Sequence, residues 1–213
     1  MKFREPFLIK MFNKLFSEEF QAKVFTPNKV NELEIIVKKF KANTCLEAGA
    51  AEGYILRSLL KKGYFKKVVA IDIREYALER GRKSAHKEQI SNKIKFKLAD
   101  TTKLPFQANS FDLVLLLDVL EHMKTIKALN TTLAECFRVC KDKLIIALPQ
   151  IYVNKPKSWL NYFDPDHLYT LIKNPKIQFV YSEKKFKNSL QKKKLKYTLV
   201  RGKVQFYYIL SKK

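Results

Sequence analysis

The chain has 213 residues, of which 46% are apolar, and this is enough for one domain with a complete core. It has no apolar run of about eighteen residues, so we expect no membrane-spanning helix. The charged N-terminus also lacks the apolar segment of a secretory signal. The three cysteines, Cys45, Cys136 and Cys140, show no metal-type pairing. This pattern predicts that the cysteines are small buried residues and that the chain has no metal site. It also indicates a protein of the reducing cytoplasm.

The net charge of +23 is compatible with a nucleic-acid or anionic-lipid partner. Lysine supplies most of the excess and is spread along the chain, whereas arginine is the better fork for phosphate. A lysine-rich composition on every exposed face is therefore the favoured interpretation. The segment 173–213 is denser, with 13 basic residues against the single acid Glu183.

Residues 1–40 are predicted to be helical and to form an N-terminal cap or lid on one compact domain, 41–213. An aromatic-rich amphipathic stretch covers 7–20, and a second helix runs from Asn28 to about Phe40. Beyond residue 41, strands and helices alternate, which predicts an α/β fold with a parallel sheet covered on both faces. The expected strands are 43–48, 67–72, 94–98, 112–118 and 143–148. The expected helices are 53–62, 74–88 and 124–139.

After Pro149 the pattern changes. We expect a loop over 151–165, a short helix over 166–173, and two final strands, 176–182 and 203–210. The second of these strands is rich in β-branched and aromatic residues. The segment 184–202 between the two strands is expected to be a long basic connection.

The first expected strand carries Glu47 near its end and enters a turn that contains Gly49 and Gly53. The next strand ends at Asp72. This is the shape of a nucleoside-binding βαβ unit, in which glycine lets the backbone approach the ligand and a distal acid holds the ribose hydroxyls. The second and third glycines of the dinucleotide fingerprint are missing, because Ala51 and Tyr54 stand there. The loop therefore favours a nucleoside without phosphates.

Acidic residues follow the expected strands. In an open α/β sheet the carboxyl ends of the strands meet at one edge, so these side chains should converge. Their negative field would attract a cationic ligand and repel phosphates, which disfavours NAD, ATP and GTP. The residues are Glu47, Glu52, Asp72, Asp100, Asp118 and Glu121.

Four segments in the expected order resemble the class I S-adenosylmethionine-dependent methyltransferases: 46–53, 70–73, 97–106 and 110–122. The last is similar to the branch that methylates small molecules such as quinones, sterols and sugars. The resemblance covers about 40–150. It implies a doubly wound, Rossmann-like seven-stranded sheet, mostly parallel with an antiparallel C-terminal hairpin. It also implies S-adenosylmethionine as the cofactor, a cationic nucleoside without phosphates, and S-adenosylhomocysteine as the product.

The resemblance assigns cofactor-binding roles to residues at this edge. Asp72 would accept both ribose hydroxyls, Glu47 would lie near the ligand ammonium, and Asp100 would accept from the adenine amino group. A helix N-cap is the alternative role for Asp72, and capping is also the alternative for Asp100. The full set is Glu47, Gly49, Ala51, Gly53, Asp72, Ile73, Asp100, Thr101 and Asp118.

Asp118 and His122 are the candidate catalytic residues. Asp118 ends an apolar strand, where it would face the methyl donor. His122 should stand at the rim of the pocket, and histidine has a pKa suited to accepting a proton near neutral pH. A strand-end cap is the alternative role for Asp118, and a capping or core role is the alternative for His122. The reaction would be an in-line displacement that depends on positioning and water exclusion.

Three functions remain open. The first is methyl transfer to a small-molecule acceptor. The second is RNA methylation that uses the basic 184–203 region as a phosphate track, with Phe186 and Tyr197 available for stacking. The third is a degenerate methyltransferase-like binding protein, since Ala51 and the turn 140–143 depart from the family pattern.

Overall fold

The computed structural model describes residues 26–123, 125–149, 187, 190–191, 195–202 and 205–212. The described helices and strands follow in chain order. They are α3 (Thr26–Val37), β1 (Thr44–Ala48), α4 (Tyr54–Lys61), β2 (Lys67–Asp72), α5 (Glu75–Lys87), β3 (Ile94–Leu98), β4 (Phe111–Leu117), the 3-10 turn η1 (Leu120–His122), α6 (Ile126–Val139), β5 (Cys140–Pro149), β6 (Tyr197–Arg201) and β7 (Gln205–Ser211).

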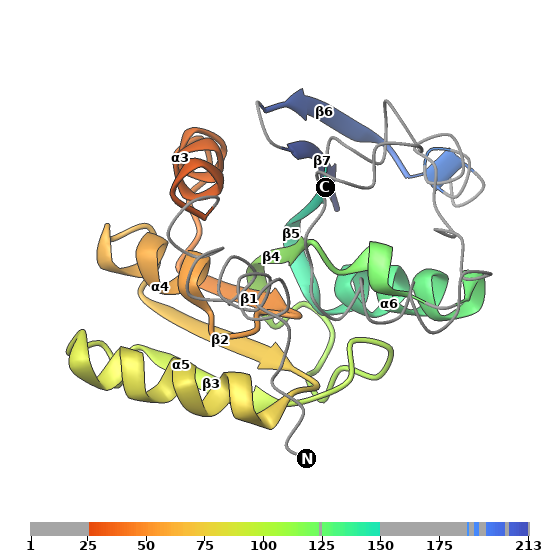
Figure 1. The fold of residues 1–213 in the computed structure, drawn as a ribbon. Helices are drawn as coiled ribbons and strands as arrows, with labels where there is room; N and C mark the ends of the chain where they lie inside the picture. Colours follow the sequence, from red (N-terminus) through yellow and green to blue (C-terminus); the bar gives the residue numbers. More distant parts are fainter. Residues whose placement is uncertain are drawn as a thin grey trace, which may run out of the picture.

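The strands form one sheet in the order β3-β2-β1-β4-β5-β7-β6 (Figure 1). The first five strands of the chain run parallel, while β7 is antiparallel to β5 and β6 is antiparallel to β7. The strand order reverses between β1 and β4. In open α/β sheets, ligands bind at such a switch point, outside the carboxyl ends of the strands.

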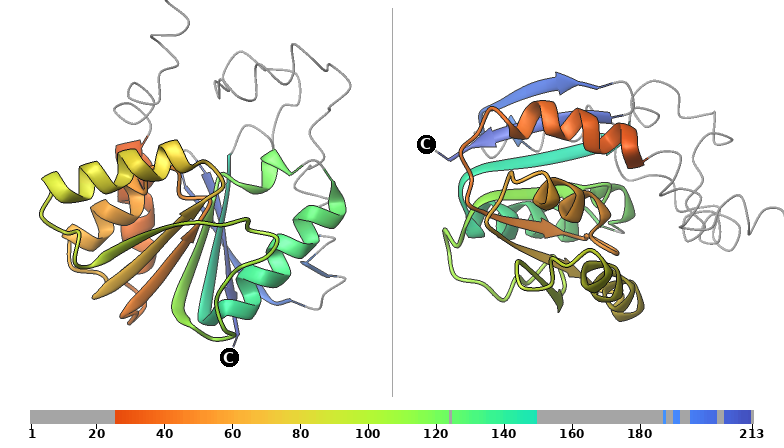
Figure 2. Two further views of the ribbon diagram at one scale, coloured as in Figure 1. Left: turned by 90° about the horizontal axis from the view of Figure 1, so that it is seen from below. Right: turned by 90° about the vertical axis from the view of Figure 1, so that its left-hand side faces the viewer.

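Helices cover both faces of the sheet (Figure 2). Side chains alternate between the faces along each strand, so Cys45 and Leu46 in β1 enter different core clusters. The first cluster joins the sheet to α3, α4 and α5, and Leu33 and Leu56 are fully buried in it. The second cluster joins the sheet to α6 through residues such as Leu129. These two layers hold the carboxyl edge of the strands in place.

The expected alternation is confirmed. Each of the five expected parallel strands and the three expected core helices is present, with ends that differ by a few residues. The helix expected over 28–40 is α3, which begins and ends earlier. Cys45, Cys136 and Cys140 are buried free thiols, and Cys140 is the first residue of β5.

The antiparallel C-terminal hairpin is present, but one of its strands was not predicted. The strand expected at 203–210 is β7. Its hairpin partner is β6, Tyr197–Arg201, within the segment expected to be a connection, so that interpretation was wrong. β6 is an edge strand, where lysine and arginine are tolerated, and the basic residues around it hid the β-forming Leu199 and Val200. The expected elements at 7–20, 151–165, 166–173 and 176–182 lie outside the described residues.

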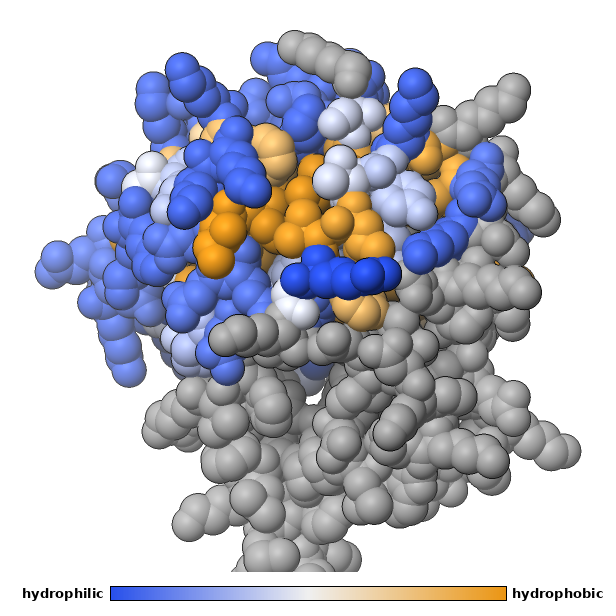
Figure 3. Space-filling view, turned by 90° about the horizontal axis from the view of Figure 1, so that it is seen from above, coloured by the Kyte–Doolittle hydropathy of each residue, from blue (hydrophilic) through white to orange (hydrophobic). Residues whose placement is uncertain are grey.

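Hydrophilic side chains dominate the face that carries α3 and β6 (Figure 3). An apolar strip crosses the middle of the coloured part of this view. No helix in the described part of the chain is long and apolar enough to cross a membrane.

Candidate functional site

The loop after β1 has a backbone that few residues can adopt. Gly49, Ala51 and Gly53 have positive φ angles of 77°, 50° and 64°. A Cβ on Gly49 would lie 2.4 Å from Cγ2 of Val119, the second residue after β4. The loop is therefore packed tightly against the end of β4, and glycine is required at position 49 for both its angle and its size.

Asp72 joins this loop to the end of β2. Its side chain is 5% exposed, and its Oδ2 accepts a hydrogen bond from the backbone N–H of Ala51 at 2.7 Å. Its Oδ1 accepts from the backbone N–H and the Nε of Arg74, at 2.9 and 3.2 Å. The N-cap of α5 is Arg74, so Asp72 does not cap that helix. A carboxylate offers about four acceptor positions, so Asp72 retains capacity for a ligand hydroxyl.

Glu47 is the buried carboxyl group of the site. It is 4% exposed, and its Oε2 has no hydrogen-bond partner among the described residues. Burial raises its pKa to about 8, and the charges of Asp118 and Asp72 act in the same direction. A hydrogen bond from the backbone of Leu56, in the first turn of α4, acts against this rise. Glu47 is therefore protonated at neutral pH until a cation comes close.

Ile73 and Asp100 lie at the same edge, on the side of β2 and β3. Ile73 is 71% exposed, and Leu98, which pairs with Asp72, is 53% exposed. The Oδ1 of Asp100 accepts from the backbone N–H and the Oγ1 of Thr102, at 2.7 and 2.8 Å. Exposed apolar side chains beside an exposed carboxylate suit a flat ring that carries an amino group.

The side chain of Thr101 points towards α6. It is 9% exposed, and its Oγ1 lies 3.2 Å from Oγ1 of Thr132 in α6. Only its backbone can therefore face a ligand at this edge.

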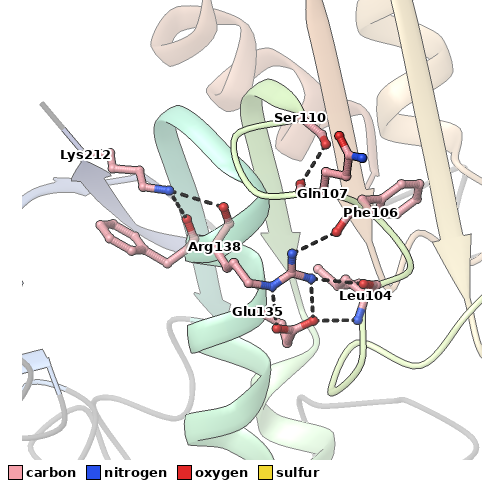
Figure 4. Close-up of polar contacts among 8 residues, drawn as sticks. Leu104, Phe106, Gln107, Ser110, Glu135, Arg138 and Lys212 are labelled. Carbon is pink, nitrogen blue, oxygen red and sulfur yellow. Dashed lines mark hydrogen bonds and ion pairs between the residues drawn. The ribbon is translucent and has the colours of Figure 1, made fainter.

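The loop between β3 and β4 is fixed on α6 by Arg138 and Glu135 (Figure 4). Arg138 donates to the carbonyl oxygens of Phe106 and Leu104, at 2.8 and 3.0 Å. Glu135 accepts from the backbone N–H of Leu104 at 2.8 Å and pairs with Arg138. Sequence reasoning missed this role, although the two residues stand three apart on an expected helix.

Asp118 is held by two residues that sequence reasoning also missed. It has a positive φ of 53°, which is rare outside glycine and is found at strained functional positions. Its Oδ2 lies 2.5 Å from Nζ of Lys29 in α3, and its Oδ1 accepts from Nε2 of Gln205, the first residue of β7. Gln205 is fully buried, and its Oε1 has no partner among the described residues. The sequence did contain a signal for Gln205, because a glutamine stands within an expected apolar strand.

His122 ends η1, and its side chain is exposed. Its backbone N–H donates to the carbonyl oxygen of Val119 at 3.1 Å. The exposed position excludes the core role.

Of the five acids of this edge whose side chains the structure describes, three are compensated by basic side chains. Glu52 pairs with Arg80 at 2.6 Å, Asp72 pairs with Arg74, and Asp118 pairs with Lys29. The negative field at this edge is therefore weaker than the sequence suggests, and the buried Glu47 stands apart from these pairs.

Comparisons with known proteins agree with this architecture. Residues 46–148 match the family model of a methyltransferase domain. No curated protein sequence matches the chain significantly.

Solved structures share the fold at low sequence identity. One is an S-adenosylmethionine-dependent methyltransferase from Aquifex aeolicus, with 20% identity and a TM-score of 0.64 over 95% of this chain and 97% of that one. Another is the methyltransferase domain of bacterial CtHen1, with 17% identity and a TM-score of 0.65 over 87% and 98%. The [4+2]-cyclase SpnF is also similar, with 15% identity and a TM-score of 0.59 over 78% and 57%. The family match shows that residues 46–148 are a methyltransferase domain, and the solved structures show that it has the fold of S-adenosylmethionine-dependent methyltransferases.

Proposed function

We propose that this chain transfers a methyl group from S-adenosylmethionine to a small-molecule acceptor. The observation that carries the proposal is Glu47, a buried carboxyl group beside Gly49 with one oxygen left without a partner among the described residues. A buried, unpaired carboxyl group is costly when ionised, and it gains most from a ligand that brings a positive charge. The ammonium of the cofactor's amino-acid tail is such a group.

The remaining edge residues take their proposed roles from their positions. Asp72 receives the ribose hydroxyls, Ile73 packs on the adenine, and Asp100 with the backbone of Thr101 faces the adenine edge. The backbone of the loop 49–53 approaches the ligand closely, because Gly49, Ala51 and Gly53 have positive φ angles. Bound S-adenosylmethionine supplies a methyl group on a positively charged sulfur, which a nucleophile displaces in line.

Gln205 and Asp118 are proposed to hold the acceptor. A carboxylate only accepts hydrogen bonds, so the Nε2 of Gln205 faces Asp118 and its Oε1 points elsewhere. That buried oxygen suits an acceptor with a hydroxyl or amine that donates a hydrogen bond. His122 at the rim takes the proton released by the acceptor. The chain promotes the reaction by positioning the donor and the acceptor and by excluding water, and it forms no covalent bond with either.

The test uses S-adenosylmethionine labelled in its methyl group. The full chain is incubated either with the small-molecule pool of a cell extract or with RNA from the same extract. We expect label in the small-molecule pool. Gln205→Leu should reduce transfer roughly tenfold or more, because a buried polar partner is lost, while S-adenosylhomocysteine binding remains. Label confined to RNA would contradict the proposal.

RNA methylation is the second candidate, and one observation favours it. Lys196, just before the edge strand β6, and Arg201, at the end of that strand, are exposed, and a phosphate backbone could lie there. Changing Lys192, Lys193 and Lys194 to glutamate should then abolish salt-dependent RNA binding and methyl transfer to RNA. Under the small-molecule proposal, the triple variant keeps its transfer activity.

A further inference from the structure

Helix α3 is locked to β7 close to the carboxyl edge of the sheet. The hydroxyl of the fully buried Tyr207 donates to Oε2 of Glu32 at 3.0 Å. Gly202, in the turn between β6 and β7, leaves room for this carboxylate, since a Cβ there would collide with it. Val30 and Leu33 of α3 are buried in the same core cluster as Tyr207. The first turns of α3 therefore have a defined position relative to the site.

Lys29 stands three residues before Glu32 and points at Asp118. The side chains of Lys29 and Asp118 are 22% and 23% exposed, and their charged atoms are 2.5 Å apart. Gln205 occupies the other oxygen of the same carboxylate. This pair is mostly shielded from water, so each charge acts on its neighbours with little screening.

The carboxylate of Asp118 lies close enough to the cofactor loop to influence it. Val119, the next residue, packs against Gly49. The strands that lead to Asp118 and Glu47 are neighbours, with Leu115 paired to Glu47. The charge of Asp118 also contributes to the raised pKa of Glu47. An unpaired negative charge at Asp118 would therefore attract any cation bound in this loop.

We propose that Lys29 sets how strongly the site distinguishes the cationic methyl donor from its neutral-sulfur product, by cancelling the charge of Asp118. This inference rests on the proposed function. Donor and product share the ammonium, the ribose and the adenine, and they differ in the charge on sulfur. A compensated Asp118 treats the two ligands nearly alike, whereas a bare Asp118 favours the donor. Lys29 is thus a positioning residue that acts through Asp118.

Calorimetric titration of the full chain with S-adenosylmethionine and with S-adenosylhomocysteine tests this. The measured quantity is the ratio of the two affinities, which a general loss of structure leaves unchanged. Lys29→Met should raise the ratio in favour of the donor by about fivefold or more, as expected for one unscreened charge nearby. Lys29→Arg keeps the charge and should keep the wild-type ratio. Lys62→Met is the matched control, because Lys62 pairs with Glu34 of α3. This variant removes another ion pair of the helix that carries Lys29 and leaves the pair between Lys29 and Asp118 intact.

Asp118→Asn should lower the ratio, because it leaves the charge of Lys29 uncompensated, and adding Lys29→Met to that variant should return the ratio towards the wild-type value. An unchanged ratio in Lys29→Met overturns the inference, as does an equal change in both affinities. It is also overturned if Lys29→Arg behaves like Lys29→Met. Failure of the wild-type chain to bind S-adenosylhomocysteine would instead refute the proposed function.

Discussion

Glu47 and Asp118 are two carboxyl groups at one edge of the sheet, in opposite surroundings. Glu47 is buried and lies apart from the ion pairs of the edge, so its pKa rises to about 8. Asp118 is partly exposed and has an ammonium and an amide N–H on its two oxygens. Because burial disfavours the charged form of a carboxyl group, Glu47 holds its proton more tightly than usual. Glu47 can therefore respond to a cationic ligand by losing a proton.

Cofactor binding should release protons from Glu47. The bound ammonium favours the ionised form, so at about pH 7 binding shifts Glu47 from protonated to charged. Affinity for S-adenosylhomocysteine should therefore increase as the pH rises towards 8. Calorimetry in buffers with different ionisation enthalpies measures the released protons. Glu47→Gln should abolish the release, and a wild-type binding heat that is independent of buffer would contradict this assignment.

Glu47 should also make the stability of the ligand-free chain depend on pH. Its pKa is raised from an ordinary 4.5 to about 8, so the folded state holds the proton more tightly than the unfolded state. Its contribution to stability is complete below about pH 4.5 and is lost as the pH rises through 8. Urea unfolding of the wild type and of Glu47→Gln should be measured over this pH range. The free energy of unfolding should fall more steeply with rising pH in the wild type. Parallel profiles would show that Glu47 titrates normally.

Substitutions at two glycines can distinguish the effect of a left-handed backbone from the effect of an added side chain that collides in the loop after β1. Gly49 and Gly63 have φ angles of 77° and 82°, but a Cβ on Gly63 meets nothing within 4 Å, whereas one on Gly49 meets Val119. Both Gly→Ala variants should lose about 1–2 kcal/mol of stability from the left-handed conformation. Only Gly49→Ala should also lose S-adenosylhomocysteine binding, measured by calorimetry. Equal binding by the two variants would place the ligand away from this loop.

Among the elements, those with a strong local pattern were predicted well. The apolar run 113–117 is fully consistent with a strand buried on both faces, and it is β4. β6 was missed because its pattern is short and lies among lysines. The rigid attachment of the loop 99–110 to α6 could not be predicted, because Arg138 holds backbone carbonyls 32 and 34 residues away.

This attachment should matter for adenine recognition. Arg138→Met leaves the carbonyls of Leu104 and Phe106 without their donor, which should cost about 1–3 kcal/mol of stability. The loosened loop should also weaken S-adenosylhomocysteine binding, since it carries Asp100. Lys212→Met is the control, because Lys212 donates to the carbonyls of Phe137 and Cys140 at the same end of α6, and it contacts the loop at Asn109, nine residues from Asp100. It should lower the unfolding free energy without weakening binding. Equal binding losses in both variants would point to a global effect.

At the scale of the whole molecule, the sequence predicted the sheet and the edge where acids gather, because both follow from local periodicity. It did not predict how those acids are paired. Lys29 and Asp118 are 89 residues apart, and Gln205 lies 87 residues beyond Asp118, so their contact depends on the complete tertiary structure. Part of the basic excess of +23 therefore serves the site, by compensating acids that would otherwise repel one another.

The central claim is that the carboxyl ends of β1, β2 and β4 hold S-adenosylmethionine, and Asp72 tests it most directly. We compare calorimetric titrations of S-adenosylhomocysteine into the wild type, Asp72→Asn, and Asp112→Asn as a control. Asp112 accepts comparable backbone hydrogen bonds from Asn43 and Thr44 where β4 begins, away from the carboxyl edge. The account predicts one site per wild-type chain, binding weakened about thirtyfold or more in Asp72→Asn, and unchanged binding in Asp112→Asn. Full-strength binding by Asp72→Asn, or no binding by the wild type at millimolar ligand, would contradict it.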